Sequence, residues 1–206
     1  FRAEDSTNRL LDLFASKNVC ATFFVLGWVA QRRPGLIRRI HAAGHEVACH
    51  GLTHQLVYRQ TPEVFREETR QSKQLLEDII GAPVDGYRAA SYSITAQSLW
   101  AIDILCELGF RYDSSIFPIA HDRYGIPGAS TRPGLMRGKD GGTIIEFPLS
   151  TAGLLGRRVP PSTSAMISPS SSISIPGRSI PTSRASTPAD CHASVITPTW
   201  MSARRA

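Results

Sequence analysis

The chain has 206 residues, of which 42% are hydrophobic and 19% charged, values typical of a soluble globular protein with one domain. No run of about 18 apolar residues occurs, which excludes a membrane-spanning helix. The net charge of +6 comes almost entirely from residues 157–206, where six arginines accompany one acidic residue, Asp190. The remaining chain is nearly neutral and has no basic stripe, which disfavours nucleic-acid binding.

Residues 5–156 alternate between helix-like and strand-like patterns. Ser6 or Thr7 is a plausible cap for the first helix, and Pro34 and Gly44 bracket the next. A third helix has Thr61 and Pro62 at its start. The expected helices are 5–18, 33–44, 61–81 and 98–109. The expected strands are 20–26, 45–49 and 142–149, and RYDSS (111–115) follows the last helix. Such repetition predicts an α/β fold with a parallel sheet, whose chemistry lies on loops after the carboxyl ends of strands.

The composition changes at the end of this pattern. Residues 161–206 contain 12 Ser, 6 Pro and 5 Thr and only one aromatic residue, Trp200. No hydrophobic periodicity survives there. We therefore expect a domain over residues 1–160 and a disordered, low-complexity Ser/Pro/Arg-rich tail over 161–206. The four cysteines are scattered without a CxxC pair, so neither a disulfide framework nor a cysteine–zinc module is expected.

The segment HEVACHGLTH, residues 45–54, raises the question of a metal site. His45 and His50 are five residues apart and would point about 140° apart on a helix, so an HExxH zinc motif is excluded. A strand that ends near Cys49 would place His50 at its tip and His54 on the following loop. Both imidazoles could then bind one ion, although local hydrogen bonding is the alternative. His45 is expected to be structural, and His41 a surface residue.

Several segments together resemble the polysaccharide deacetylases of the NodB-homology type, which include chitin deacetylases. GHEVACHGLTH is similar to their His-box, with Cys49 where Ser or Thr is usual. GYRAASYSIT resembles their arginine-containing motif, LGFRYDSSIFPIAHDRYGIP the next one, and GGTIIEFPLST a following strand. The sequences of these motifs most resemble those of the exosortase-associated exopolysaccharide deacetylase subgroup. The resemblance covers about residues 1–160.

The resemblance implies a distorted (β/α) barrel of the NodB-homology type, incomplete at both ends in this chain. It also implies a hydrolase that removes N-acetyl groups from an amino-sugar polysaccharide. The family's divalent metal, usually Zn²⁺, is held by two histidines and an aspartate and activates water. An aspartate acts as base and a histidine protonates the leaving amine.

The likeness also assigns residues. His50 and His54 match the metal ligands, and Arg88 matches the arginine that orients the base aspartate. Asp113 lies in the next motif and is expected to support the site or line the groove. Two residues, Ser91 and Tyr92, are expected to bind substrate, one as backbone donor and one as groove wall. Ala90 replaces the family's proline, which predicts a looser loop. Trp28 could line a sugar groove, but a Trp in an apolar run is more often in the core.

Two departures from the family pattern are expected to affect activity. The acidic motif that supplies the base and the third ligand should precede residue 1, and the Leu-His-Pro-Trp motif that supplies the acid is absent. A nucleotide sequence that encodes residues 171–185 can also encode the Leu-His-Pro-Trp motif when one nucleotide is added in front and the reading frame shifts. We therefore predict that the residues after about 160 were translated in the wrong reading frame. This chain is therefore expected to have reduced activity or none. An inactive carbohydrate-binding fragment is the alternative function, and no localisation is predicted.

Overall fold

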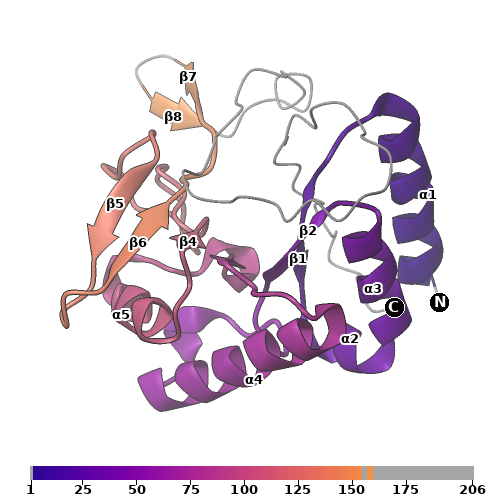
Figure 1. Cartoon of the computed structure of the whole chain (residues 1–206). Helices are drawn as coiled ribbons and strands as arrows, with labels where there is room; N and C mark the ends of the chain where they lie inside the picture. Colours follow the sequence, from indigo (N-terminus) through magenta and orange to yellow (C-terminus); the bar gives the residue numbers. More distant parts are fainter. Residues whose placement is uncertain (1, 155–156, 160–206) are drawn as a thin grey trace, which may run out of the picture.

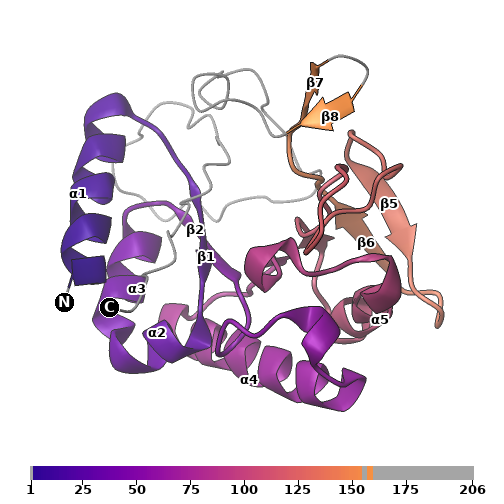
Figure 2. The same ribbon diagram turned by 180° about the vertical axis from the view of Figure 1, so that it is seen from behind.

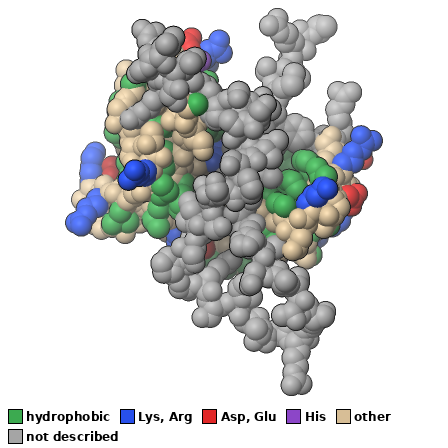
Figure 3. Space-filling model, turned by 90° about the horizontal axis from the view of Figure 1, so that it is seen from above, with side chains coloured by type: hydrophobic (Ala, Val, Ile, Leu, Met, Phe, Trp, Pro, Cys, Tyr) green, Lys and Arg blue, Asp and Glu red, His purple; other side chains and the backbone are tan. Residues whose placement is uncertain are grey.

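The structure is a computed structural model that describes residues 2–154 and 157–159. The predicted disordered and out-of-frame tail, residues 161–206, lies outside the described residues. Among the described helices, none combines the length and apolarity needed to cross a lipid bilayer. On the face shown in Figure 3, Lys and Arg side chains lie at separate places on the described surface.

A six-stranded sheet forms the centre of the molecule (Figure 1). Its strands run in the order β1 (Thr22–Val25), β2 (Glu46–Cys49), β3 (Gly86–Tyr87), β4 (Tyr112–Asp113), β6 (Thr143–Glu146) and β5 (Gly134–Arg137). All neighbours are parallel except β5 and β6, which are antiparallel. The predicted α/β fold with a parallel sheet is confirmed. Within the described residues the sheet is an open arc with β1 and β5 at its edges, as expected for an incomplete barrel.

Helices cover the outer side of this arc (Figures 1 and 2). They are α1 (Arg2–Lys17), α2 (Gly27–Arg32), α3 (Pro34–Ala42), α4 (Pro62–Ile80) and α5 (Trp100–Glu107). Short 3₁₀ turns, η1 (Val57–Arg59), η2 (Ala90–Tyr92) and η3 (Ala96–Ser98), lie on the loops, and β7 (Ala152–Leu154) pairs with β8 (Arg157–Val159). The helices thus leave the inner side of the arc and its loops to form a site.

Local sequence signals explain most helix ends. The Thr61 hydroxyl accepts a hydrogen bond from the Val64 amide, and Gly81 ends α4 with a left-handed φ of 66°, a conformation that favours glycine. Pro34 occupies the first turn of α3, where its missing N–H costs nothing. The predicted cap at Ser6 or Thr7 is wrong, because α1 begins at Arg2.

Candidate functional site

The loop that carries the histidine pair begins directly after β2 and is fixed by three hydrogen bonds. The first two amides of α2, those of Gly27 and Trp28, each donate at 2.9 Å to the carbonyls of Gly51 and Leu52. The Ser72 hydroxyl of α4 also donates to the Gly51 carbonyl, at 3.0 Å. A Cβ atom at Gly27 would lie 2.7 Å from Leu52 Cδ1 and 2.9 Å from Ser72 Oγ, so a larger residue here would force both side chains to shift. The loop is therefore a supported part of the fold.

The imidazoles of His50 and His54 lie together at this edge, with ring centroids 5.1 Å apart. Two imidazoles on one tetrahedral zinc ion would have their centroids about 5 Å apart, given metal–nitrogen distances of about 2.0–2.1 Å. His50 Nδ1 lies 2.7 Å from the Arg88 carbonyl oxygen. Since a carbonyl only accepts, Nδ1 carries the proton and Nε2 presents its lone pair. Burial lowers the pKa of His50 to about 4, which keeps this imidazole neutral, as a metal ligand must be.

Backbone strain is concentrated at the same place. His54, Ser91 and Tyr92 have φ values of 63°, 50° and 54°, in the left-handed region that non-glycine residues seldom adopt. In the described chain only one other non-glycine residue, Asn18 after α1, shares this property. Such strain costs about 1–3 kcal/mol per residue and clusters at functional sites. This observation marks the loops after β2 and β3 without reference to any sequence motif.

Arg88 follows β3 and is only 5% exposed, so it is not in a surface ion pair. Its Nε donates to the Ser114 carbonyl at 2.9 Å, and its Nη2 donates to the Ser114 hydroxyl at 2.6 Å. Its guanidinium carbon lies 4.1 Å from the centre of the Phe24 ring, a favourable cation–π distance. These contacts join β1, β3 and the loop after β4 beneath the histidine pair.

Asp113 lies at the end of β4 and is fully buried. Its carboxylate accepts hydrogen bonds from the amide and the hydroxyl of Ser115, and the same hydroxyl accepts one from the Ala89 amide at 2.8 Å. A fully buried carboxylate cannot line a groove, so that part of the prediction is wrong. Asp113 instead holds the loops after β3 and β4 together.

Glu146 of β6 lies opposite Asp113 in the sheet register and is 6% exposed. Its Oε1 accepts from the Ile116 amide at 3.0 Å, whereas Oε2 is buried without a hydrogen-bond partner. Burial, followed by the charge of Asp113, raises the pKa of Glu146 to about 11. Glu146 therefore carries a proton at neutral pH, next to the buried Asp113 carboxylate. Glu146 was not predicted from the sequence, although an acidic residue within the apolar strand TIIEF was a usable signal.

The two predicted substrate-binding residues lie on η2. Ser91 is exposed and Tyr92 is half-buried, and the Tyr92 ring packs edge-on against Tyr124 at a centroid distance of 6.1 Å. The Tyr92 amide donates to the Ala89 carbonyl at 3.2 Å, so it is engaged within the turn. The ring of Tyr92, rather than its amide, is therefore the group available to a ligand.

Two further predictions have opposite outcomes. His45 is buried and structural, as predicted: its Nδ1 accepts from the Ala21 amide at 3.3 Å, and its ring packs against Phe14 and Phe23. Trp28 was expected in the core, but it is 41% exposed, and Arg32 stacks 4.0 Å above its ring. Trp28 follows β1 at the edge that carries the histidine loop, which makes it a further candidate for contact with ligand.

Comparison with known proteins identifies this arrangement. A family model described as polysaccharide deacetylase matches residues 2–112, more than half of the chain. The chain belongs to the polysaccharide deacetylase family. A second model, described as a domain of unknown function (DUF3473), matches residues 114–165 of this family member.

Individual relatives of this polysaccharide deacetylase family chain agree with that assignment. A chitooligosaccharide deacetylase of Bradyrhizobium sp. (strain ANU 289) is 34% identical over 95 residues, covering 46% of this chain and 43% of the relative. A peptidoglycan deacetylase of Helicobacter pylori is 30% identical over 116 residues, covering 56% and 39%. The chain thus spans less than half of the length of these curated relatives.

Solved structures support the fold. A crystal structure from Mycobacterium smegmatis, described as a polysaccharide deacetylase, is 32% identical with a TM-score of 0.58, covering 69% of this chain and 45% of that one. An allantoinase with 22% identity and a TM-score of 0.57 covers 70% and 43%. At that identity the allantoinase shows a shared fold alone.

Proposed function

We propose that this chain is part of a metal-dependent hydrolase that removes N-acetyl groups from an amino-sugar exopolysaccharide. The observation that carries the proposal is the histidine pair, His50 and His54, which lies at the carboxyl edge of the sheet in a chain of the polysaccharide deacetylase family. The neutral His50 imidazole with its lone pair on Nε2 supports metal binding.

A divalent metal, in our proposal Zn²⁺, would be held by His50 Nε2 and by the His54 ring. When bound, zinc supplies Lewis-acid activation of a water molecule and of the amide carbonyl. Catalytic zinc usually has three protein ligands. In the described part of the chain, no group of three His, Cys, Asp or Glu residues is placed to hold an ion. The two imidazoles are suitable zinc ligands, but they supply only two of the usual three. We therefore expect this chain to bind zinc weakly.

The remaining residues position rather than bind the metal. We propose that Arg88 fixes the His50 tautomer through its carbonyl and sets the loop after β4 through Ser114. Asp113 would hold the same loop in place through its hydrogen bonds with Ser115. Tyr92 would contact the sugar through its ring, and the exposed Ser91 hydroxyl would hydrogen-bond a polar substituent of the same sugar.

Zinc binding by the full 206-residue chain, measured by isothermal titration calorimetry, tests the proposal. His50→Ala and His54→Ala should each weaken zinc binding by at least about 10-fold. His41→Ala, which removes an exposed imidazole on α3, is the matched control and should leave the affinity unchanged. Equal zinc affinity in all four proteins would refute the assigned site.

Acetate release from chitohexaose, with zinc and with a chelator, tests the activity itself. We expect weak, zinc-dependent release, because neither the family's acidic motif nor its Leu-His-Pro-Trp motif is recognisable in the sequence. A carbohydrate-binding role without chemistry is the second candidate, and the two-ligand site favours it. Saturable binding of chitohexaose without any acetate release would establish this second role.

A further inference from the structure

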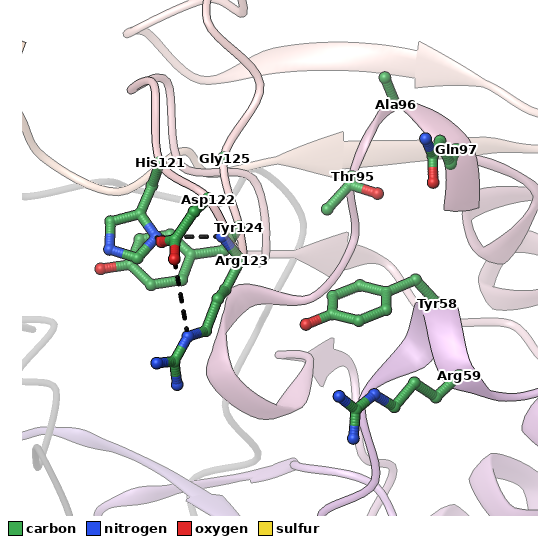
Figure 4. Close-up of a pocket in the computed structure, with 10 residues that line it drawn as sticks. All are labelled: Tyr58, Arg59, Thr95, Ala96, Gln97, His121, Asp122, Arg123, Tyr124 and Gly125. Carbon is green, nitrogen blue, oxygen red and sulfur yellow. Dashed lines mark hydrogen bonds and ion pairs between the residues drawn. The ribbon is translucent and has the colours of Figure 1, made fainter.

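A hollow with a volume of about 490 Å³ lies among the loops that follow β2, β3 and β4, within the range of small-ligand sites. Figure 4 shows the residues that surround it. Those used below come from three separate segments and are Tyr58, Arg59, Gln97 and, on the third segment, residues 121–124.

The hollow is built on the same three loops as the candidate site. The loop after β2 begins with His50 and reaches Arg59, and the loop after β3 begins with Arg88 and reaches Gln97. The loop after β4 begins beyond Asp113 and reaches Tyr124. The rings of Tyr92 and Tyr124, 6.1 Å apart, connect the two places. The contact between Tyr92 and Tyr124 therefore links the loop of the candidate site to the hollow.

One wall of the hollow is a stack of aromatic rings. The His121 ring lies 3.8 Å from the Tyr124 ring with only 8° between their planes. The buried Phe117 ring supports Tyr124 from behind, with its centroid 5.9 Å away and 6° between the planes. Tyr58 stands on the opposite side of the gap (Figure 4). Rigid aromatic side chains combine a large apolar face with a polar tip, which suits a ring with both apolar and hydroxyl groups.

Positive charge exceeds negative charge at the opening. Arg59 and Arg123 are both exposed, and their guanidinium groups lie toward the same end of the gap. Asp122 is the one carboxylate among the residues that line it, and it lies 2.7 Å from His121 Nδ1 and 3.9 Å from Arg123 Nε. It can offset one of the two cations. For Arg59, no ion pair occurs within the described residues.

We propose that this hollow binds a sugar residue with a carboxylate group, a uronic acid, adjacent to the N-acetylated residue at the histidine pair. The planar fork of a guanidinium matches a carboxylate, which can accept two parallel hydrogen bonds. The substrate class is then an acidic polysaccharide with alternating or neighbouring uronic acid and N-acetylhexosamine units. This inference rests on the proposed function for the identity of the neighbouring sugar.

The test compares two ligands that differ only in charge. Calorimetry with the full chain would measure the Kd for a hyaluronan hexasaccharide, which alternates glucuronic acid and N-acetylglucosamine. The second ligand is the same hexasaccharide with its carboxylates reduced to hydroxymethyl groups. We expect the acidic form to bind about 10-fold more tightly. Equal affinities for the wild-type chain would overturn the proposal without recourse to any variant.

A pair of double variants locates the effect. Arg59→Gln with Arg123→Gln should remove the preference for the acidic ligand. Arg9→Gln with Arg38→Gln changes the net charge equally at exposed positions of α1 and α3 and should preserve it. Loss of the preference in both double variants would show general charge attraction and would also overturn the proposal. Because binding is measured without zinc or turnover, failure of acetate release would affect only the proposed function.

Discussion

The histidine pair and the buried polar cluster beneath it are close in space but are built for different purposes. The cluster, which consists of Arg88, Asp113, Ser114, Ser115 and Glu146, is buried, and its polar groups bond mainly to one another and to the backbone. In the histidine pair, by contrast, His54 is exposed and has a strained backbone. The comparison indicates that the cluster stabilises the fold while the pair remains available to a ligand.

The largest effect should follow from breaking the buried cluster. Asp113→Ala removes the acceptor of two buried hydrogen bonds and one of the two carboxyl groups near the buried Arg88 charge, so it should lower the free energy of unfolding by about 3–5 kcal/mol. Urea denaturation would measure this loss. Asp122→Ala, at an exposed carboxylate, should change stability by less than about 0.5 kcal/mol. Similar values for the two variants would mean that the cluster does not stabilise the fold.

The raised pKa of Glu146 predicts a pH dependence of the stability of the cluster. The pKa of Glu146 rises from 4.5 to about 11 on folding, so the folded chain binds more protons than the unfolded chain between these values. The stabilising contribution of Glu146 is complete below its unfolded pKa and is lost as pH rises toward the folded one. The loss is at most about 1.4 kcal/mol per pH unit for one proton.

Glu146→Gln should remove this contribution, since an amide does not titrate. Between pH 6 and pH 9, roughly the middle of that window, the unfolding free energy of wild type should fall relative to that of the variant. Urea denaturation at several pH values would measure the difference. Parallel curves for the two proteins would show that Glu146 is ionised in the folded state.

The smallest effect is expected at the histidine pair. His54→Gly relieves a left-handed φ of 63° but adds chain entropy to the unfolded state, so stability should rise by no more than about 1 kcal/mol. The same change should abolish the contribution of His54 to zinc binding. Thermal denaturation and zinc titration together would check the two outcomes. A loss of stability as large as that of Asp113→Ala would contradict the separation of roles.

Local signals were sufficient to predict the parallel sheet and the helix ends at Pro34, Thr61 and Gly81. They were insufficient for β5, a short antiparallel edge strand in which Leu135 is 62% exposed, because an edge strand needs no hydrophobic alternation. The expected burial of Trp28 was wrong for a related reason. Apolar neighbours in the sequence do not determine whether a side chain points into the core or toward solvent.

The site was predicted unevenly. Spacing and strand direction were enough to expect His50 and His54 side by side, and their metal binding stays a prediction. The contact of Glu146 with Asp113 depends on strand register across 33 residues of sequence, which no local pattern encodes. The strained φ values at Ser91 and Tyr92 likewise arise from the tertiary packing of the loop.

The hydrogen bond from His50 Nδ1 to the Arg88 carbonyl has a mechanical consequence. Strands β2 and β3 share a single registered pair, Cys49 with Tyr87, and the Arg88 amide donates to the Cys49 carbonyl. The His50 imidazole thus adds a side-chain hydrogen bond between β2 and β3, the two neighbouring strands with the fewest registered pairs. A metal ion bound by the His50 ring would therefore also stabilise the pairing of β2 with β3. Slower hydrogen–deuterium exchange at the Arg88 amide would then indicate that the ion is bound.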